Sequence, residues 1–228
     1  MAINPEADPP HSRNSKSTTN LYLAIMDHIG LLRNYLHQFQ LLTNEEVELI
    51  VTASEIECVE KGTILLEEGQ VSNKCHFLLK GCVREYVIKD GDEKTTGFYT
   101  EGQALDPFSP PVNPPPSKYN LVCVEDCVFA VSKSTLVEEM CRIIPRLETL
   151  IVEEVQRNGM RAQDEISRFI TSSPEERYLY LLENRPDLLN RVPQHQIASY
   201  IGVTPESLSR IRKRMTARVS NTTSVKTP

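Results

Sequence analysis

Four polar residues near the C-terminal end share one face of an expected helix. Residues 194–214 read QHQIASYIGVTPESLSRIRKR, and at about 100° per residue the second half places four polar side chains together: Glu206, Ser209, Arg210 and Lys213. Arginine can donate two hydrogen bonds to guanine O6 and N7, and glutamate can accept one from the cytosine amino group. This face therefore predicts contacts with the base edges of DNA.

Basic and polar residues beside that face suit phosphate groups, which position a protein without reading sequence. We assign phosphate contacts to five residues: His195, Ser207, Arg212, Lys213 and Arg214. The chain has a net charge of −6, but the residues after Asn190 include seven basic residues and one acidic residue. A basic module attached to an acidic body is the arrangement that docking on phosphates requires.

Two helices joined by a tight turn must position these side chains. Gly202 stands where a positive φ is often needed, and Thr204 and Pro205 form a start signal for the second helix. Apolar or small residues fall where two crossed helices touch: Ile197, Ala198, Ile201, Val203, Leu208 and Ile211. The pattern predicts a helix-turn-helix. The alternative is a helical hairpin in a bundle, whose cationic face is only solvated.

Residues 55–132 differ from this segment, because short β-rich runs alternate there with turn signals. Asp90-Gly91 is a strong hairpin signal. Strands this short and frequent predict an antiparallel barrel or double-sheet jelly roll. The preceding residues 21–52 show helical spacing of apolar residues, with Thr43 and Glu46 as a capping box.

A long helix is expected between these two parts. Ser134 opens a short helix that ends before Pro145, and a longer helix follows. Its apolar stripe predicts a dimer seam and consists of Leu147, Leu150, Ile151, Val155, Ala162, Ile166 and Phe169. The alternative is that the stripe packs on its own barrel. Asn158-Gly159 interrupts the pattern, and a further helix over Pro174 to Glu183 leads into the C-terminal pair.

The expected fold class is therefore α+β, with five parts. These are a disordered tail (1–20), a barrel domain (21–140), a dimerisation helix (141–170), a helix-turn-helix domain (171–216) and a flexible tail (217–228). The residues after Met215 are too few and too polar for a β-hairpin wing. No signal peptide or membrane-length apolar run is present, and the six cysteines lack CxxC spacing, which predicts reduced thiols in the cytoplasm.

Barrel, long helix and C-terminal helix-turn-helix, in that order, resemble the cyclic-AMP receptor protein and fumarate-nitrate regulator (CRP/FNR) superfamily of transcription factors. Lys61-Gly62, Glu68-Gly69 and FLLKGCVR (77–84) look like that family's cyclic-nucleotide-binding, cupin-like barrel. The segment from Ser172 to Arg214 resembles a branch common in Bacteroidetes-type bacteria.

The resemblance implies roles for individual residues and for partners. Glu206, Ser209 and Arg210 match the family's base-contacting Glu, Ser and Arg. The implied operator is double-stranded DNA with an inverted repeat of a half-site related to TTGAT or TGTGA, held by a homodimer. Family members that activate transcription also touch RNA polymerase, but no motif places such a patch here. No membrane partner is implied.

The effector site departs from the family pattern. Cyclic-nucleotide binders of the family carry a Gly-Glu pair followed by Arg-Ser/Thr-Ala, but here no glutamate follows Gly102, and Pro116 stands at the arginine position. Ser117 is retained, and Lys118 offers a substitute cation, so Gly102, Ser117 and Lys118 form the candidate effector pocket. Lysine supplies only a point charge where a buried phosphate needs a bidentate partner. The sequence therefore disfavours cyclic AMP, and no cofactor or metal ion is assigned.

Cysteines and histidines give weaker signals. Residues 1–57 contain no cysteine, which argues against the family's N-terminal iron–sulfur cluster. Cys75 and His76 point to opposite faces of an expected strand, which favours a buried cysteine beside an exposed histidine over a haem ligand. Cys123 and Cys127 fit one face of a strand, either as core thiols or as a redox pair.

Two functions from different classes follow. The first is a dimeric, sequence-specific transcription regulator whose barrel controls DNA binding. The second is a ligand-binding or protein-interaction module of the cyclic-nucleotide-binding type with a vestigial helix-turn-helix. An enzyme is not predicted, because no nucleophile–base pair, metal cluster or phosphate-binding glycine loop is recognisable.

Overall fold

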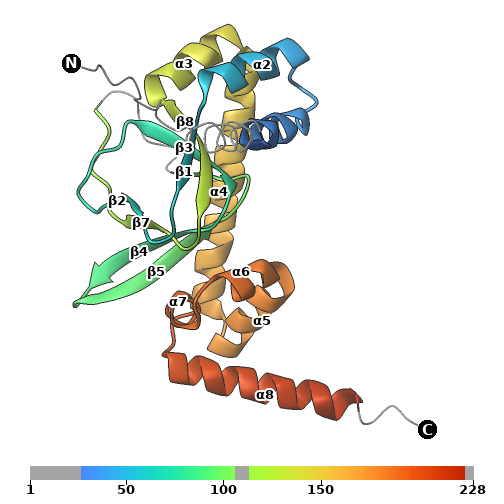
Figure 1. Ribbon diagram of the computed structural model, residues 1–228. Coiled ribbons are helices and arrows are strands. Elements are labelled where there is room, and N and C mark those ends of the chain that lie inside the picture. The colour runs from blue at the N-terminus through green and yellow to red at the C-terminus, as the bar shows by residue number, and fades with distance from the viewer. Residues whose placement is uncertain (1–26, 106–112, 224–228) are drawn as a thin grey trace, which may run out of the picture.

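The computed structural model describes residues 27–105 and 113–223, with side chains up to residue 215. The tail expected over residues 1–20 lies outside this range. Two four-stranded antiparallel sheets form a jelly roll, with strand orders β1-β8-β3-β6 and β2-β7-β4-β5 (Figure 1). The strands are β1 Glu55–Val59, β2 Ile64–Leu66, β3 Lys74–Lys80, β4 Val83–Lys89, β5 Asp92–Tyr99, β6 Ala104–Leu105, β7 Asn120–Cys123 and β8 Cys127–Lys133.

The barrel interior is filled by side chains from both sheets. Leu78, Val83 and Phe129 are completely inaccessible to solvent. The predicted hairpin joins β4 and β5. Asp90 and Gly91 at its turn both have positive φ, 56° and 84°, as a two-residue type I′ turn requires.

Two helices cover the outer face of the first sheet. One spans residues 27–37, and α2 spans Asn44–Ala53. The predicted capping box of α2 is confirmed: the Thr43 hydroxyl accepts from the Glu46 N–H, and the Glu46 carboxylate accepts from the Thr43 N–H. Their apolar side chains form one cluster with Leu79, Val128 and Ala130 of the sheet.

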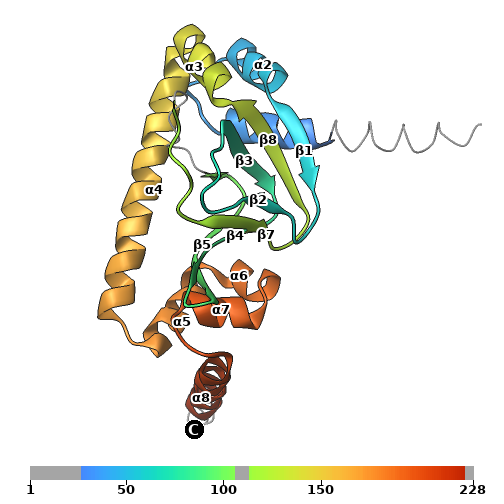
Figure 2. The same ribbon diagram turned by 90° about the vertical axis from the view of Figure 1, so that its left-hand side faces the viewer.

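The long helix α4, Pro145–Thr171, follows the short α3, Ser134–Ile143, so the expected boundary at residue 141 falls inside α3. The helix continues without a break through Asn158 and Gly159. It runs along one side of the barrel to the C-terminal part (Figure 2). The predicted stripe divides into two parts. Leu147, Leu150, Ile151 and Val155 face the protein's own barrel side, as in the alternative interpretation, whereas Ile166 and Phe169 are exposed.

Four helices follow α4 in the described part of the chain: α5 Pro174–Asn184, α6 Pro186–Arg191, α7 Gln194–Tyr200 and α8 Pro205–Thr223. α5 begins with a second capping box, formed by Ser173 and Glu176. α8 lies at the end of the molecule farthest from α2 and α3 (Figure 1). It runs past the boundary expected at residue 216 as far as Thr223, and no strand follows it within the described residues.

Candidate nucleic-acid interface

The turn between α7 and α8 has the geometry expected of a helix-turn-helix. Gly202 has a φ of +76°, which confirms the predicted positive φ, and the Val203 N–H donates to the Ala198 carbonyl at 2.9 Å. A Cβ at Gly202 would lie 2.8 Å from Cζ of Phe169 at the end of α4. Glycine is therefore favoured here by its backbone conformation and by the closeness of a neighbouring ring.

The start of α8 follows the predicted capping pattern. The Ser207 N–H donates to the Thr204 hydroxyl at 3.3 Å, and the Leu208 N–H donates to the Thr204 carbonyl at 3.0 Å. Pro205 is the first residue of the helix, where its missing N–H leaves no hydrogen bond unmade. The Thr204 and Ser207 hydroxyl oxygens also lie within hydrogen-bond distance of each other, at 3.2 Å, so Ser207 takes part in the cap.

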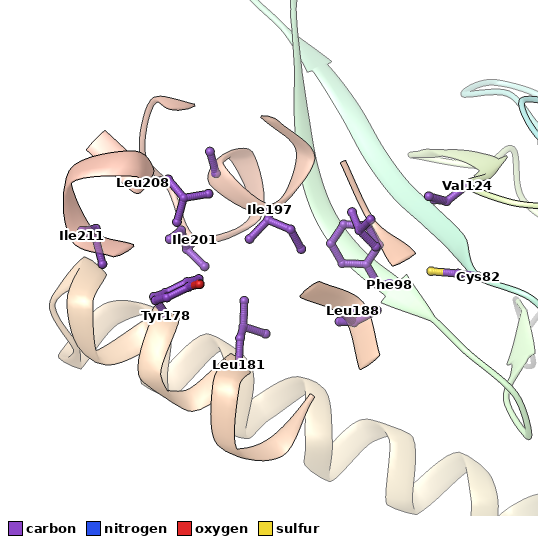
Figure 3. Close-up of a cluster of buried hydrophobic side chains, with 12 residues drawn as sticks. Cys82, Phe98, Val124, Tyr178, Leu181, Leu188, Ile197, Ile201, Leu208 and Ile211 are labelled. Atoms are coloured by element: carbon purple, nitrogen blue, oxygen red, sulfur yellow. The ribbon is translucent and has the colours of Figure 1, made fainter. Parts of the chain in front are cut away.

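The inward faces of α7 and α8 meet in a closed apolar cluster. Figure 3 shows Ile197, Ile201, Leu208 and Ile211 directed toward side chains of α5 and α6. Five of the six predicted contact residues are buried and Val203 is half-buried, which confirms the expected inward face. The cluster continues into the barrel through Cys82, Phe98 and Val124.

The outward face of α8 presents the four predicted polar side chains to solvent: Glu206, Ser209, Arg210 and Lys213. Hydrogen bonds from its own N–H and from the Thr204 hydroxyl hold the pKa of the Glu206 carboxyl below its usual value, and the charge of Arg210 acts in the same direction. The face therefore combines an ionised acceptor with two cationic donors.

The five residues assigned to phosphate contacts have different surroundings. His195 is exposed at the start of α7, and Lys213 has no ion pair within the described part of the chain. Arg212 donates to the Gln194 side chain at 2.7 Å, and Arg214 forms an ion pair with Glu175 of α5. The two arginines are thus oriented by neighbours on the protein surface.

Arg177 holds the turn before α8 in place, a role that the sequence pattern does not indicate. Its guanidinium donates to three main-chain carbonyls, those of Ile201 at 2.9 Å, Phe169 at 2.7 Å and Ser172 at 2.9 Å. These hydrogen bonds connect the end of α4 and the start of α5 to the turn that precedes α8. Nothing in the local sequence around Arg177 indicates such distant acceptors.

A second unpredicted feature joins the helix-turn-helix part to the barrel. Arg191 at the end of α6 forms ion pairs with Glu101 and Glu125 of the barrel. The Thr95 N–H donates to the Ser199 hydroxyl at 3.0 Å, and the rings of Phe98 and Tyr200 pack edge to face with centroids 5.2 Å apart. The β4–β5 hairpin is therefore packed directly against α7.

The structure places the three candidate effector residues in separate local roles. Gly102 has a φ of +82° and lies under Tyr35, whose hydroxyl donates to the Gly102 carbonyl at 3.2 Å. The Ser117 hydroxyl donates to the Tyr119 carbonyl at 2.7 Å, and Lys118 is exposed. None of the three lines the cavity of about 310 Å³ beside α4 or that of about 500 Å³ beside α7.

Two expectations about cysteine and histidine are wrong. His76 is half-buried, not exposed, because it packs edge-on against Phe129 of the barrel interior at 5.7 Å, and burial lowers its pKa. Cys75 is half-buried on the other face of β3. Cys123 and Cys127 lie on β7 and β8, in different sheets and not on one strand, but both are buried free thiols, as the core-thiol alternative predicts.

The described ranges hold no group of three or more His, Cys, Asp or Glu side chains arranged to bind a metal ion. Among the described helices, none combines the length and the apolar character needed to cross a bilayer.

Residues 56–143 match the family model of the cyclic nucleotide-binding domain. Solved structures extend the likeness beyond these residues. FixK2 from Bradyrhizobium japonicum is 17% identical with a TM-score of 0.63, over 72% of this chain and 85% of that chain. The c-di-GMP-responsive global regulator CLP from Xanthomonas campestris is 16% identical with a TM-score of 0.62, over 77% and 93%.

The catabolite activator protein of Thermus thermophilus is 19% identical with a TM-score of 0.50, over 79% of this chain and 86% of that chain. A search of curated protein sequences found no match. At these identities the likeness establishes the fold: a jelly roll of the cyclic nucleotide-binding type followed by helices, as in these three proteins.

Proposed function

We propose that the protein is a transcription regulator of the CRP/FNR type, which acts in the cytoplasm and binds inverted-repeat DNA operators as a homodimer. One observation carries the proposal. A capped helix, held by a closed apolar cluster on one side, presents Glu206, Ser209 and Arg210 to solvent on the other. An arginine and a glutamate on such a face are able to discriminate G·C base pairs in the major groove.

The remaining residues on this surface support a role in docking. Lys213 and His195 are exposed near Glu206, Ser209 and Arg210, and Arg212 and Arg214 flank this outward face of α8. Their charges suit contacts with phosphates, and such contacts fix the position of α8 along the DNA. The resemblance of residues 172–214 to the Bacteroidetes-type branch supports a half-site related to TTGAT or TGTGA. The two half-sites would then lie about one helical turn, roughly 34 Å, apart.

An exposed apolar stripe on α4 supports the homodimer. Val152, Ile166 and Ile170 are 46%, 62% and 76% exposed, and their spacing places them along one line of the helix. An apolar line of this kind on a helix of 27 residues is suited to pairing with a second copy.

Direct packing between barrel and helix-turn-helix supports control by the barrel. The ion pairs of Arg191 and the contact between Phe98 and Tyr200 connect the β4–β5 hairpin to α6 and α7. A change in the barrel that moves this hairpin therefore acts on the element that carries the reading helix.

The proposal is tested by fluorescence anisotropy with a labelled TTGAT-type palindrome and a scrambled duplex of equal length, at two salt concentrations. We expect tighter binding to the palindrome and a steep decrease of affinity with salt. Arg210→Ala should weaken palindrome binding by about 1–3 kcal/mol and reduce the preference over the scrambled duplex. Arg142→Ala, which removes another exposed arginine in α3, far from α8, is the matched control.

The alternative, an interaction module with a vestigial helix-turn-helix, predicts a different result. Both duplexes would then bind with the same affinity, and Arg210→Ala would behave like Arg142→Ala. That outcome would exclude sequence-specific reading by α8.

A further inference from the structure

A cavity of about 310 Å³ lies on the outer face of the first sheet, away from the barrel interior. Its walls come from the helix over residues 27–37, α2, β3, β6, β8, α3 and α4, on this side of the jelly roll (Figures 1 and 2). Small-molecule sites in proteins usually enclose roughly 300–1,000 Å³. The space is thus large enough for a compact organic ligand.

The lining is mostly apolar, and its described polar groups are largely engaged. Aromatic and aliphatic side chains dominate, among them Tyr35, Phe39, Phe77, Met140, Leu150 and Val155. The Tyr35 hydroxyl donates to Gly102, the Ser54 hydroxyl to Ile50 at 2.9 Å and the Ser134 hydroxyl to Asn73 at 3.1 Å. Few polar groups are left to hold a polar ligand.

The charges around the cavity restrict the ligand further. The lining contains Glu138 and Glu154, which form ion pairs with Arg142 and Arg157 outside the lining, and over the described residues it contains no lysine, arginine or histidine. A buried phosphate or carboxylate needs a paired cation, and these two arginines are already paired with the glutamates of the lining. The lining therefore disfavours anions and suits an uncharged molecule.

The cavity is also separate from the α4 stripe proposed for dimer formation. Leu147, Leu150, Ile151 and Val155 line the cavity, whereas Val152, Ile166 and Ile170 are exposed roughly a third of a turn away around the same helix. A second copy seated on that stripe leaves the cavity face of α4 directed toward its own barrel. A second copy is therefore not the occupant favoured by this geometry.

We infer that this cavity binds a neutral lipophilic small molecule, at a site distinct from the barrel interior and from the reading helix. The bound molecule would contact α4, the element that links the barrel to the helix-turn-helix. The inference concerns ligand binding alone and holds whether or not the protein binds DNA.

The test is a fluorescence titration of the full-length protein with the uncharged probe 1-N-phenylnaphthylamine. We expect saturable binding with one site per chain. Ala53→Leu and Ala104→Leu add carbon atoms inside the cavity from two different elements and should each weaken probe binding at least tenfold. Ala162→Leu adds the same atoms at an exposed position of α4 that lines the other cavity, beside α7, and should leave binding at the first cavity unchanged. A cooperative urea unfolding transition for each variant is the check that the variant is folded.

Competition identifies the class of ligand. Decan-1-ol should displace the probe at a concentration at least tenfold lower than decanoate at pH 8, because no cation in the described lining can pair with the carboxylate of decanoate. Equal displacement by both compounds would overturn the assignment to a neutral ligand. Equal binding by the filled variants and Ala162→Leu, or one probe per two chains, would overturn the site itself.

Discussion

Arg191 and Glu101 form a bidentate ion pair between two parts of the chain that are 90 residues apart in sequence. The guanidinium Nη1 and Nη2 donate to the two carboxylate oxygens at 3.0 and 2.7 Å. The Glu101 carboxylate also accepts from the Gly81 N–H at 2.8 Å, which ties it to the β3–β4 turn of the barrel. The end of α6 is therefore held on the barrel with a defined orientation.

Arg191→Ala should lower the free energy of unfolding by about 1–2 kcal/mol, a value limited by the partial exposure of Glu101. Arg191→Lys should recover only part of this, since an ammonium group cannot donate in the planar fork geometry. Urea denaturation measures both changes. Hydrogen exchange should show faster exchange in α6, α7 and the β4–β5 hairpin of the alanine variant. Unchanged exchange would mean that the ion pair does not hold these elements together.

The same ion pair predicts a pH dependence. Burial acts to raise the pKa of Glu101, but hydrogen bonds from Arg191 and the Gly81 N–H outweigh it, so the pKa lies below its usual value. A carboxyl of this kind stabilises the fold above its unfolded pKa, about 4.3, and this stabilisation is lost as the pH falls through the folded pKa. The stability difference between the wild type and Glu101→Gln should therefore be largest near neutral pH and decrease below about pH 4.3. A constant difference between pH 7 and pH 3 would contradict this role for Glu101.

Gly202→Ala should destabilise the protein by about 1–3 kcal/mol. The residue must keep a φ of +76°, and its new methyl group would approach the Phe169 ring at 2.8 Å. Gly30→Ala is the matched control, because Gly30 lies inside the helix over residues 27–37 with nothing within 4 Å of the added Cβ. That control should gain roughly 0.5–1 kcal/mol. Chemical denaturation of the two variants checks the opposite signs, and equal effects would show that Gly202 needs no special conformation.

Local signals made the helix-turn-helix predictable. Thr204, Pro205 and Gly202 each act within a few residues of their own position, through a cap, a fixed φ and a left-handed turn. The Asp90-Gly91 hairpin was predictable for the same reason. The interdomain ion pair was not, because neither Arg191 nor Glu101 carries any sign of its partner in the surrounding sequence.

The α4 stripe shows a second limit of sequence patterns. Periodicity identified Leu150, Ile151 and Ile166 as neighbours along one helix, but it does not say which surface covers each of them. Leu150 is buried on the side of α4 that faces the barrel, whereas Ile166 is exposed. His76 was placed incorrectly for a related reason: alternation separates it from Cys75 but does not say which of the two faces is the interior.

The exposed part of α4 predicts the behaviour of a double variant. If Val152 and Ile170 pair with a second copy, Val152→Glu with Ile170→Glu places like charges in the seam and should shift the protein to monomers. Sedimentation velocity measures this shift. Ile88→Glu, at a 59% exposed position near the tip of the β4–β5 hairpin, is the control and should leave the oligomeric state unchanged. A double variant that sediments like the wild type would exclude this stripe as the seam.

Two neighbouring cations on α8 should contribute differently to DNA binding. Lys213 is exposed without an ion pair in the described chain, whereas Arg214 is already paired with Glu175. Lys213→Ala should therefore reduce the slope of log affinity against log salt by about 1, since one phosphate contact is lost. Arg214→Ala should change the slope less, because Glu175 already neutralises much of its charge.

Glu175→Gln should raise affinity by freeing Arg214, and this rise should disappear in the Glu175→Gln, Arg214→Ala double variant. Anisotropy titrations over several salt concentrations measure all four proteins, and equal slopes for Lys213→Ala and Arg214→Ala would show that the pair with Glu175 opens on DNA.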